Sequence, residues 1–331
     1  MEKILVYTNL TTSADVVKVE GYLGCSEYEF EFETNYYNHC RRDHKQYAHV
    51  FGLVDTASHI VSDEYRKDLL MKCRTLQEKR ARIVLINLWE SKDQINKTAY
   101  PKLLQDFDYL VWHGGMTFFW WLMYERYRKQ QFYFEHSQKY FDFMYLNKAQ
   151  RHHRDLLFDS LINKGLLDKS LYSYHHRGIA LDQKYEMQQY RDSYPQYGAD
   201  RDIFERPYND SAWNIVSETS VDEKFITEKT WKPILAKQPF IVHGYSGILA
   251  DLRQLGFNTF SDWIDESYDT LQDLASRTKS IVGVCESVMK QDYENVYSKT
   301  TDAREHNHRL FFDGKKLSEA VTKDVNLLLE F

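Results

Sequence analysis

Short apolar runs alternate with amphipathic stretches along the first part of the chain. The run Ser62–Lys79 mixes charged residues with leucines, carries acidic residues near its start and basic residues near its end, and so predicts a helix. Runs with a β-branched bias predict buried strands at Lys3–Thr8, His49–Val54, Arg82–Leu88 and Tyr109–Trp112. Strands alternating with helices indicate βαβ units and a mostly parallel sheet.

The same alternation restarts in the second half. Apolar runs predict strands at Tyr140–Leu146, Leu171–Tyr174, Trp213–Val216, Pro239–His243 and Phe257–Phe260. Amphipathic stretches predict helices at Asp155–Lys164, Ile248–Leu255, Asp265–Val284 and Lys315–Leu329. Glycines 165 and 256 follow two of these helices, as expected at helix C-termini.

Two βα halves in 331 residues predict an α/β protein of two Rossmann-like domains facing each other across a cleft. We expect the first domain to span residues 1–135 and the second to span 136–300. Residues 301–331 are expected to form a C-terminal helix that packs back toward the first domain. Ligands of such sheets bind at the carboxyl ends of strands, so the loops there are the first place to look for chemistry.

Composition narrows the class of function. Lys and Arg total 43 against 49 Asp and Glu, a net charge of −6, which argues against nucleic-acid binding through phosphate neutralisation. The four cysteines form no C-x-x-C pair, so neither a zinc ribbon nor a disulfide framework is predicted. The most apolar stretch, Tyr109–Tyr124, is shorter than the roughly 20 residues that a membrane span needs. The N-terminal residues lack a signal-peptide pattern.

The segment that follows the strand at Trp213–Val216 combines polar, acidic and basic side chains before a predicted helix. Backbone N–H groups at a helix start together with Lys229 suit a diphosphate, and Glu228 suits sugar or ribose hydroxyls. Pro233 favours Thr230 over Thr227 as the N-cap, because proline is tolerated in a first turn but kinks a helix interior. The amides of Thr227–Lys229 would then stay free for a ligand.

A second basic turn, Asn147–Arg154, follows the strand at Tyr140–Leu146. Cations at a helix N-terminus oppose the helix dipole, so the basic residues there favour a bound anion. Arg154 suits bidentate contact with a diphosphate. The neighbouring histidines lack further Asp, Glu or His partners in the sequence, so no metal site is predicted.

These two segments resemble the donor-binding motifs of glycosyltransferase family 10, the α1,3-fucosyltransferases, whose enzymes have the GT-B fold. The family pattern F-E-N-S/T, a short loop, then Y-V/I-T-E-K is similar to Ser217–Ser220 followed by Phe225–Lys229. The family's second motif is similar to Phe143–Leu161, with Asn147 in the turn and Arg154 at the phosphate-binding position. The resemblance covers about a third of the chain.

The resemblance implies an inverting, metal-independent transfer of a sugar from a nucleotide donor to a glycan hydroxyl, with no cofactor. It implies that Arg154 and Lys229 neutralise the diphosphate and that Glu218 and Glu228 orient donor hydroxyls. The chain departs from the family at two positions: Thr219 replaces Asn, and Phe225 replaces Tyr. A nucleotide sugar is therefore the firmer expectation, and GDP-fucose the more specific one.

An inverting transferase also needs a carboxylate to take the acceptor's proton. In the family this is a Glu in the first domain after a strand, which Glu90 matches. A surface Glu at the start of a loop is the plain alternative, and His113 and Asp55, each at the end of a strand, are the other candidate bases.

Other features keep alternatives open. The aromatic block Phe118–Phe134 favours core packing over acceptor stacking or a membrane-surface face. The D-x-D at Asp106–Asp108 precedes a strand and is interpreted as strand entry, not as a metal motif. The alternatives in function are a GT-B transferase with another donor sugar and a silent carbohydrate- or nucleotide-binding module. Without the membrane anchor of animal family members, the chain is expected to be cytoplasmic.

Overall fold

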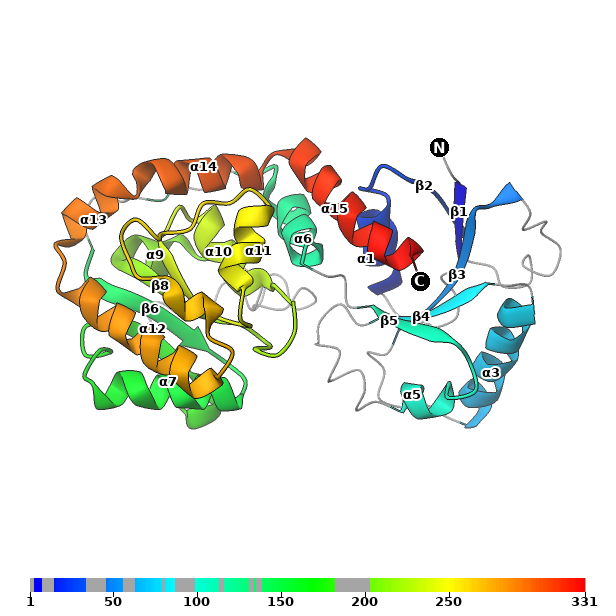
Figure 1. The fold of residues 1–331 in the computed structure, drawn as a ribbon, viewed down its shortest axis with the longest axis horizontal. Coiled ribbons are helices and arrows are strands. Elements are labelled where there is room, and N and C mark those ends of the chain that lie inside the picture. Colours follow the sequence, from blue (N-terminus) through cyan, green and yellow to red (C-terminus); the bar gives the residue numbers. More distant parts are fainter. Residues whose placement is uncertain are drawn as a thin grey trace. The chain divides into compact units, whose positions relative to one another are not determined.

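A computed structural model of the chain describes residues 3–7, 15–33, 46–55, 63–78, 81–86, 99–112, 116–130, 134, 139–181 and 203–330 (Figure 1). The chain divides into two compact units. Unit 1 comprises Met1–Leu122 with Gly314–Phe331, and unit 2 comprises Met123–Asp313. The predicted divisions were at residues 135 and 300. In the structure, helix α14 (Thr301–Phe311) belongs to unit 2 and only α15 (Gly314–Leu329) belongs to unit 1.

Unit 1 is built on a five-stranded parallel sheet of order β2-β1-β3-β4-β5. Its strands are β1 (Lys3–Tyr7), β2 (Glu29–Glu33), β3 (His49–Asp55), β4 (Arg82–Ile86) and β5 (Tyr109–Trp112). The edge strand β2 was not predicted. Its sequence EFEFE pairs residue for residue with β1, and the alternation of charge and ring is typical of a half-exposed edge.

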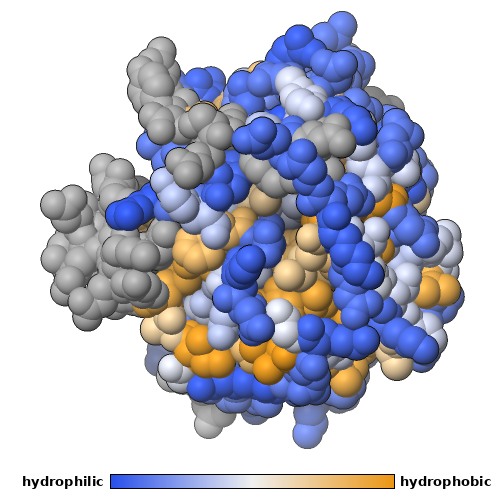
Figure 2. Space-filling view, turned by 90° about the vertical axis from the view of Figure 1, so that its left-hand side faces the viewer, coloured by the Kyte–Doolittle hydropathy of each residue, from blue (hydrophilic) through white to orange (hydrophobic). Residues whose placement is uncertain are grey.

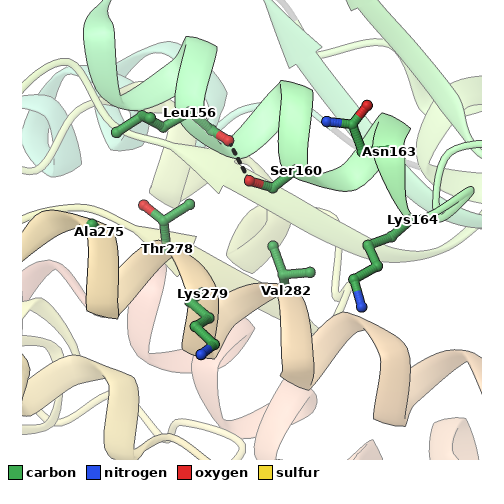
Figure 3. A pocket seen from close by; sticks show the side chains of 8 residues that line it. All are labelled: Leu156, Ser160, Asn163, Lys164, Ala275, Thr278, Lys279 and Val282. Carbon is green, nitrogen blue, oxygen red and sulfur yellow. Dashed lines mark hydrogen bonds between the residues drawn. The ribbon is translucent and has the colours of Figure 1, made fainter.

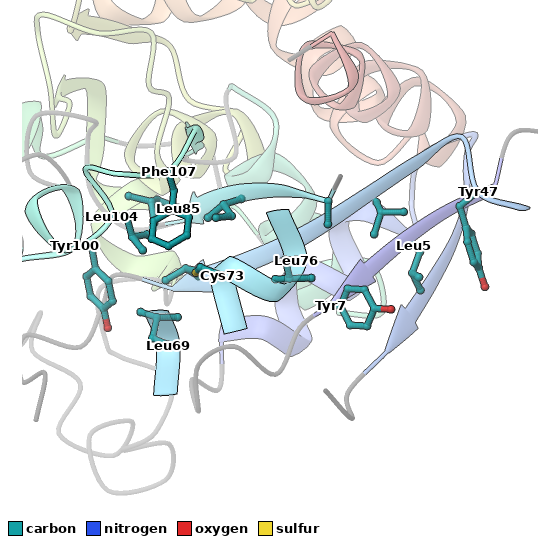
Figure 4. Close-up of a cluster of buried hydrophobic side chains, with 14 residues drawn as sticks. Leu5, Tyr7, Tyr47, Leu69, Cys73, Leu76, Leu85, Tyr100, Leu104 and Phe107 are labelled. Carbon is teal, nitrogen blue, oxygen red and sulfur yellow. The ribbon is translucent and has the colours of Figure 1, made fainter. Parts of the chain in front are cut away.

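Helix α3 (Asp63–Glu78) covers one face of this sheet, and the core of unit 1 lies between them (Figure 4). Leu69, Cys73 and Leu76 come from one side of the helix at spacings of three and four residues. They are buried together with Leu5 and Leu85 of the sheet. Short helix α5 (Tyr100–Leu103) closes the end of the cluster with Tyr100.

The C-terminal helix α15 packs on unit 1 through a buried polar group. The Asp324 carboxylate accepts hydrogen bonds from the Thr117 amide at 3.1 Å and the Thr117 hydroxyl at 2.6 Å. The Tyr22 hydroxyl of helix α1 (Asp15–Leu23) reaches Thr117 Oγ1 at 2.7 Å. Burial raises the pKa of both Asp324 and Tyr22. Near the end of α15, the Leu329 carbonyl accepts from the Arg82 guanidinium.

The aromatic block forms helix α6 (Phe118–Tyr127), and its rings are core residues. Phe118 and Trp120 are completely buried, and Phe118 and Trp121 pack against the Tyr22 ring. The prediction of core packing is confirmed for the described part of the block. Asp108 directly precedes β5, as predicted.

Unit 2 is built on a four-stranded parallel sheet of order β7-β6-β8-β9. Its strands are β6 (Phe141–Asn147), β7 (Leu171–Tyr174), β8 (Ser211–Ser217) and β9 (Phe240–His243). Its helices are α7 (His152–Asn163), α9 (Glu205–Asp210), α10 (Glu228–Leu235), α11 (Ile248–Gln254), α12 (Leu274–Met289), α13 (Tyr293–Lys299) and α14. Two α/β units, each with a parallel sheet, confirm the predicted fold class.

Two predicted elements of unit 2 were wrong in detail. Helix α7 starts at His152, so the basic residues lie in its first turn rather than before it. Phe257–Phe260 forms no strand. Instead, the Phe260 ring packs edge-on against Trp213 and Phe240. The region Asp265–Val284 was predicted to be helical, and it contains a 3₁₀ turn at Ser267–Thr270 and most of α12. Asp273 is the N-cap of α12, and its carboxylate accepts from the Ser276 amide.

The surface of unit 2 is mixed. In the view of Figure 2 hydrophilic residues cover most of this end, and hydrophobic residues reach the surface in patches between them. Scattered apolar exposure of this kind is ordinary for globular proteins. Among the described helices, none combines the length and apolar character that crossing a bilayer requires.

Candidate functional site

The order in which the chain adds strands to the sheet of unit 2 reverses between β6 and β8. From β6 the chain goes out to β7 and then returns to place β8 on the other side of β6. Ligands of open α/β sheets bind at the carboxyl ends of the strands at such a switch point. Here β6 ends at Asn147 and β8 ends at Ser217. The two sequence motifs therefore follow the two strands that flank the switch point.

Glu218 lies at the centre of the site and is completely buried. Its carboxylate accepts four hydrogen bonds. Oε1 accepts from the Thr227 amide at 3.1 Å and the Thr230 hydroxyl at 2.5 Å. Oε2 accepts from the Thr219 amide at 3.2 Å and the Thr227 hydroxyl. All four groups are donors, and together they occupy both carboxylate oxygens.

Helix α10 begins one turn earlier than the sequence predicted. Its N-cap is Thr227, whose hydroxyl accepts from the Lys229 amide, and Pro233 lies inside the helix. The Thr230 amide bonds to the Thr227 carbonyl. The prediction of a Thr230 N-cap with free amides before it was therefore wrong. The carboxylate of Glu218 fixes the Thr227 amide and the Thr230 hydroxyl, which favours the early start over the cost of an interior proline.

Lys229 and Glu228 form an ion pair at the start of α10, in which Lys229 is partly exposed and Glu228 is buried. Lys229 Nζ lies 2.8 Å from Glu228 Oε1 and 3.2 Å from the hydroxyls of both Thr219 and Thr227. Burial alone would raise the pKa of Glu228, but Lys229 and Lys232 outweigh it, so the pKa is lowered and the carboxylate stays ionised. The lysine side chain keeps 29% of its surface exposed. Its ammonium already donates to three protein oxygens, so an anion from solvent would have to share or replace one of these contacts.

Two side chains of α7 hold the backbone of β8 from the other side. The Glu218 carbonyl accepts from His153 Nε2 at 2.9 Å and from Arg154 Nη2 at 3.0 Å. Arg154 also donates to the carbonyls of Ala149 at 3.1 Å and Ser217 at 3.4 Å. Burial lowers the pKa of Arg154 and lowers that of His153 to about 4, so the imidazole is neutral at pH 7.

Polar atoms without partners gather in the same turn. Within the described residues, both amide atoms of Asn147 and the Nε atoms of Arg151 and Arg154 are buried and have no hydrogen-bond partner of ordinary geometry. Arg151 is the N-cap of α7 and caps it with no side-chain bond. Buried polar groups without partners are uncommon and mark places where a water or ligand belongs.

The two positions that depart from the family pattern have different surroundings. Thr219 is partly exposed and its hydroxyl accepts from the Lys229 ammonium. Phe225 is completely buried, so its ring is part of the packing beneath the loop. Thr219 therefore lies at the edge of the site and Phe225 beneath it.

The chain is similar to solved structures of α1,3-fucosyltransferase. One matches over 100% of this chain and 91% of its own, at 9% identity and a TM-score of 0.47. Another, with GDP, matches over 100% and 90%, at 9% identity and a TM-score of 0.46. A co-structure of S. aureus MnaA with UDP matches over 100% and 97%, at 9% identity and a TM-score of 0.37. Neither a family model nor a curated protein sequence matches the chain. Values this low carry no functional assignment, which must rest on the residues.

The structure brings together the site residues predicted in the second half and leaves the candidate base undescribed. Asn147, Glu218 and Thr219 lie at the carboxyl ends of β6 and β8, and Arg154, Glu228 and Lys229 lie in the first turns of the helices α7 and α10 that follow. Glu90 and His113 lie outside the described residues, and Asp55 ends β3 with its side chain outside them. Within the described residues no group of three His, Cys, Asp or Glu side chains is placed to hold a metal ion.

Sequence reasoning missed a buried histidine pair beneath the site. The rings of His153 and His243 meet edge to face at a centroid distance of 5.6 Å. His243 Nε2 lies 3.2 Å from the Thr278 hydroxyl of α12. Burial lowers the pKa of His243 well below its usual value. A histidine ending a strand, as His243 does, was a visible signal, but its partner came from another element 90 residues away.

A surface groove of about 400 Å³ lies between α7 and α12 (Figure 3). Leu156 and Val282 supply part of its apolar lining, and Lys164 and Lys279 lie at its border. Of the predicted site residues that the structure describes, none is among the residues that line it. Thr278 connects the groove to the histidine pair through its bond to His243.

Proposed function

We propose that the protein is an inverting glycosyltransferase that moves a sugar from a nucleoside diphosphate to a glycan hydroxyl without a metal ion. GDP-fucose is the donor that the sequence motifs favour. The observation that carries the proposal is the arrangement at the β6–β8 switch point: a partly exposed Lys229 side chain in a turn held by Glu218, together with the basic first turn of α7.

The chemistry needs stabilisation of a leaving diphosphate. The acceptor oxygen attacks the anomeric carbon, and the bond from that carbon to the diphosphate oxygen breaks with its electron pair leaving on the diphosphate. A preorganised cation near that oxygen stabilises the developing charge. Lys229 is our candidate, because its Nζ is positioned by the Thr219 and Thr227 hydroxyls and by Glu228, and its side chain is partly exposed.

Arg154 is held in place by the protein and is not free to close around a phosphate group. Three backbone carbonyls already occupy its Nη atoms, while its Nε has no partner within the described residues. We propose that it supplies a fixed positive charge behind the turn and that the Asn147 amide offers a hydrogen-bonding group beside it. Both are consistent with an anion at the start of α7.

Glu90 is the proposed base. It would take the proton from the acceptor hydroxyl as that oxygen attacks, leaving the product neutral at that position. Glu228, ionised and at the edge of the turn, is the proposed acceptor of hydrogen bonds from donor hydroxyls. The Thr219 hydroxyl contacts the Lys229 ammonium, which pairs with Glu228, and Phe225 is buried.

Binding of nucleotides tests the donor half of the proposal. We expect a thermal-shift panel of GDP, UDP, ADP and CMP to show stabilisation by GDP. Lys229→Met should weaken GDP binding by about 10- to 100-fold, the value of a charge-assisted contact to phosphate. Lys290→Met, at an exposed lysine after α12, is the matched control and should bind like wild type.

Hydrolysis or transfer of GDP-fucose tests the catalytic half. Glu90→Gln should abolish turnover and keep nucleotide binding. A preference for UDP would redirect the proposal to another donor sugar. Binding without turnover under any donor would instead indicate a silent binding module, and absence of binding by all four nucleotides would contradict the proposal altogether.

A further inference from the structure

Glu218 is the residue that connects the two basic turns. Its backbone carbonyl is held by His153 and Arg154 of α7. Its side-chain carboxylate holds the first turn of α10 through Thr227 and Thr230. One residue therefore fixes the turn after β6 and the turn after β8 relative to each other.

We infer that Glu218 is a positioning residue that sets the location of the Lys229 ammonium and does not itself contact the donor. This inference rests on the proposed function and refines the earlier expectation that Glu218 orients donor hydroxyls. The side chain is completely buried, and both of its carboxylate oxygens are occupied by groups of the protein.

The most direct connection from the Glu218 carboxylate to Lys229 is the Thr227 hydroxyl, and Thr219 provides a second one through its amide and its hydroxyl. Thr227 Oγ1 donates its single proton to Glu218 Oε2, which leaves its lone pairs for other donors. Lys229 Nζ, at 3.2 Å, and the Lys229 amide, at 3.5 Å, both donate to that same oxygen. The carboxylate thus orients the hydroxyl as an acceptor for the ammonium. A glutamine side chain in this position would place its NH₂ group, which can only donate, against protein groups that also donate.

The first experiment compares ligands with and without phosphate. We expect Glu218→Gln to weaken GDP and inorganic pyrophosphate by at least about tenfold, since a hydrogen-bond network to a charged group is lost. Guanosine affinity should stay unchanged. A general loss of structure would weaken guanosine as well, and a Glu218 that bound donor hydroxyls would leave pyrophosphate unaffected. Glu294→Gln, at an exposed glutamate of α13, is the control.

A second pair of variants guards against misfolding of Glu218→Gln. Thr230 is completely buried and gives its hydroxyl to Glu218. Thr230→Val keeps the shape and removes the donor, so it should weaken GDP by several-fold at unchanged guanosine affinity. Thr230→Ser keeps the hydroxyl and should restore GDP affinity. Equal effects of valine and serine would overturn the inference.

Hydrogen exchange separates failure of this inference from failure of the proposed function. In Glu218→Gln the amides of residues 219–230 should exchange at least about tenfold faster, with α12 unchanged. Unchanged exchange at these amides would overturn the inference whatever binds. If the exchange is faster but wild-type protein binds neither GDP nor pyrophosphate, the proposed function fails while the organising contacts of Glu218 stand.

Discussion

Arg154→Met is the substitution that best separates a structural arginine from a ligand-binding one. Arg154 is buried, with 3% of the residue exposed, and its guanidinium donates to the carbonyls of Ala149, Ser217 and Glu218. The variant has a side chain of similar length and no charge. We expect it to destabilise unit 2 even when no nucleotide is present, because three carbonyls lose their donor.

The size of the effect follows from those contacts. The two bonds at 3.1 and 3.0 Å come from a charged donor and are worth roughly 1.5–3 kcal/mol each, and the one at 3.4 Å adds little. Removing a buried guanidinium returns part of this, since its burial was unfavourable. A net loss of about 3 kcal/mol remains, which lowers the Tm of a unit of this size by roughly 6–12 °C.

Urea unfolding and calorimetry without ligand measure this directly. Arg154→Lys is the informative companion, because one ammonium reaches fewer carbonyls than the planar fork of arginine and should recover only part of the stability. Unchanged ligand-free stability of Arg154→Met, combined with lost GDP binding, would refute the reasoning. Arg154 would then be a ligand contact whose backbone bonds contribute nothing measurable.

Three further predictions concern stability. Burial holds the pKa of His153 at about 4 and that of His243 well below its usual value, so mainly the unfolded chain takes up protons as the pH falls through about 6.5. Stability should be nearly full above about pH 7.5 and fall by about 1 kcal/mol per histidine between pH 6.5 and 5.5, measured by urea unfolding at each pH. Thr117→Val removes the hydroxyl bonded to Asp324 and should reduce stability by about 1–3 kcal/mol, which Thr117→Ser should restore; equal Tm values for the two variants would contradict this. Trp231→Ala should cost about 3–5 kcal/mol, because the ring is fully buried against Phe257 and Phe311, and Trp231→Phe should retain most of the unfolding free energy.

The strands were predictable wherever the sequence contains a continuous run of apolar residues. Buried parallel strands read as continuous apolar runs, as β4 and β9 do, and these were found within one or two residues. Strand β2 was missed because its charged positions alternate with rings and give no apolar run. Phe257–Phe260 was wrongly predicted as a strand. Its apolar residues are typical of a strand, but in the structure the Phe260 ring packs on Trp213 from a segment without regular structure.

The site residues were predictable because local sequence motifs carry them, whereas their partners were not. Thr227, Glu228 and Lys229 are adjacent in sequence, and the acid–lysine pair forms between neighbours. The contact between Arg154 and the Glu218 carbonyl joins residues 64 positions apart, and no local pattern encodes it. From the sequence, an arginine at position 154 indicated a bound anion. Only the structure shows that backbone carbonyls accept hydrogen bonds from most of its N–H groups.

The start of α10 shows how a buried side chain overrides local preference. From sequence alone, the cost of Pro233 inside a helix of about 3 kcal/mol favoured the later N-cap at Thr230. That cost is offset at the earlier start, because Thr227 then gives both its amide and its hydroxyl to Glu218 while Thr230 adds a second hydroxyl. A carboxylate with four donors is satisfied only in this register. The helix start and the position of Lys229 are thus consequences of one glutamate at the end of the preceding strand.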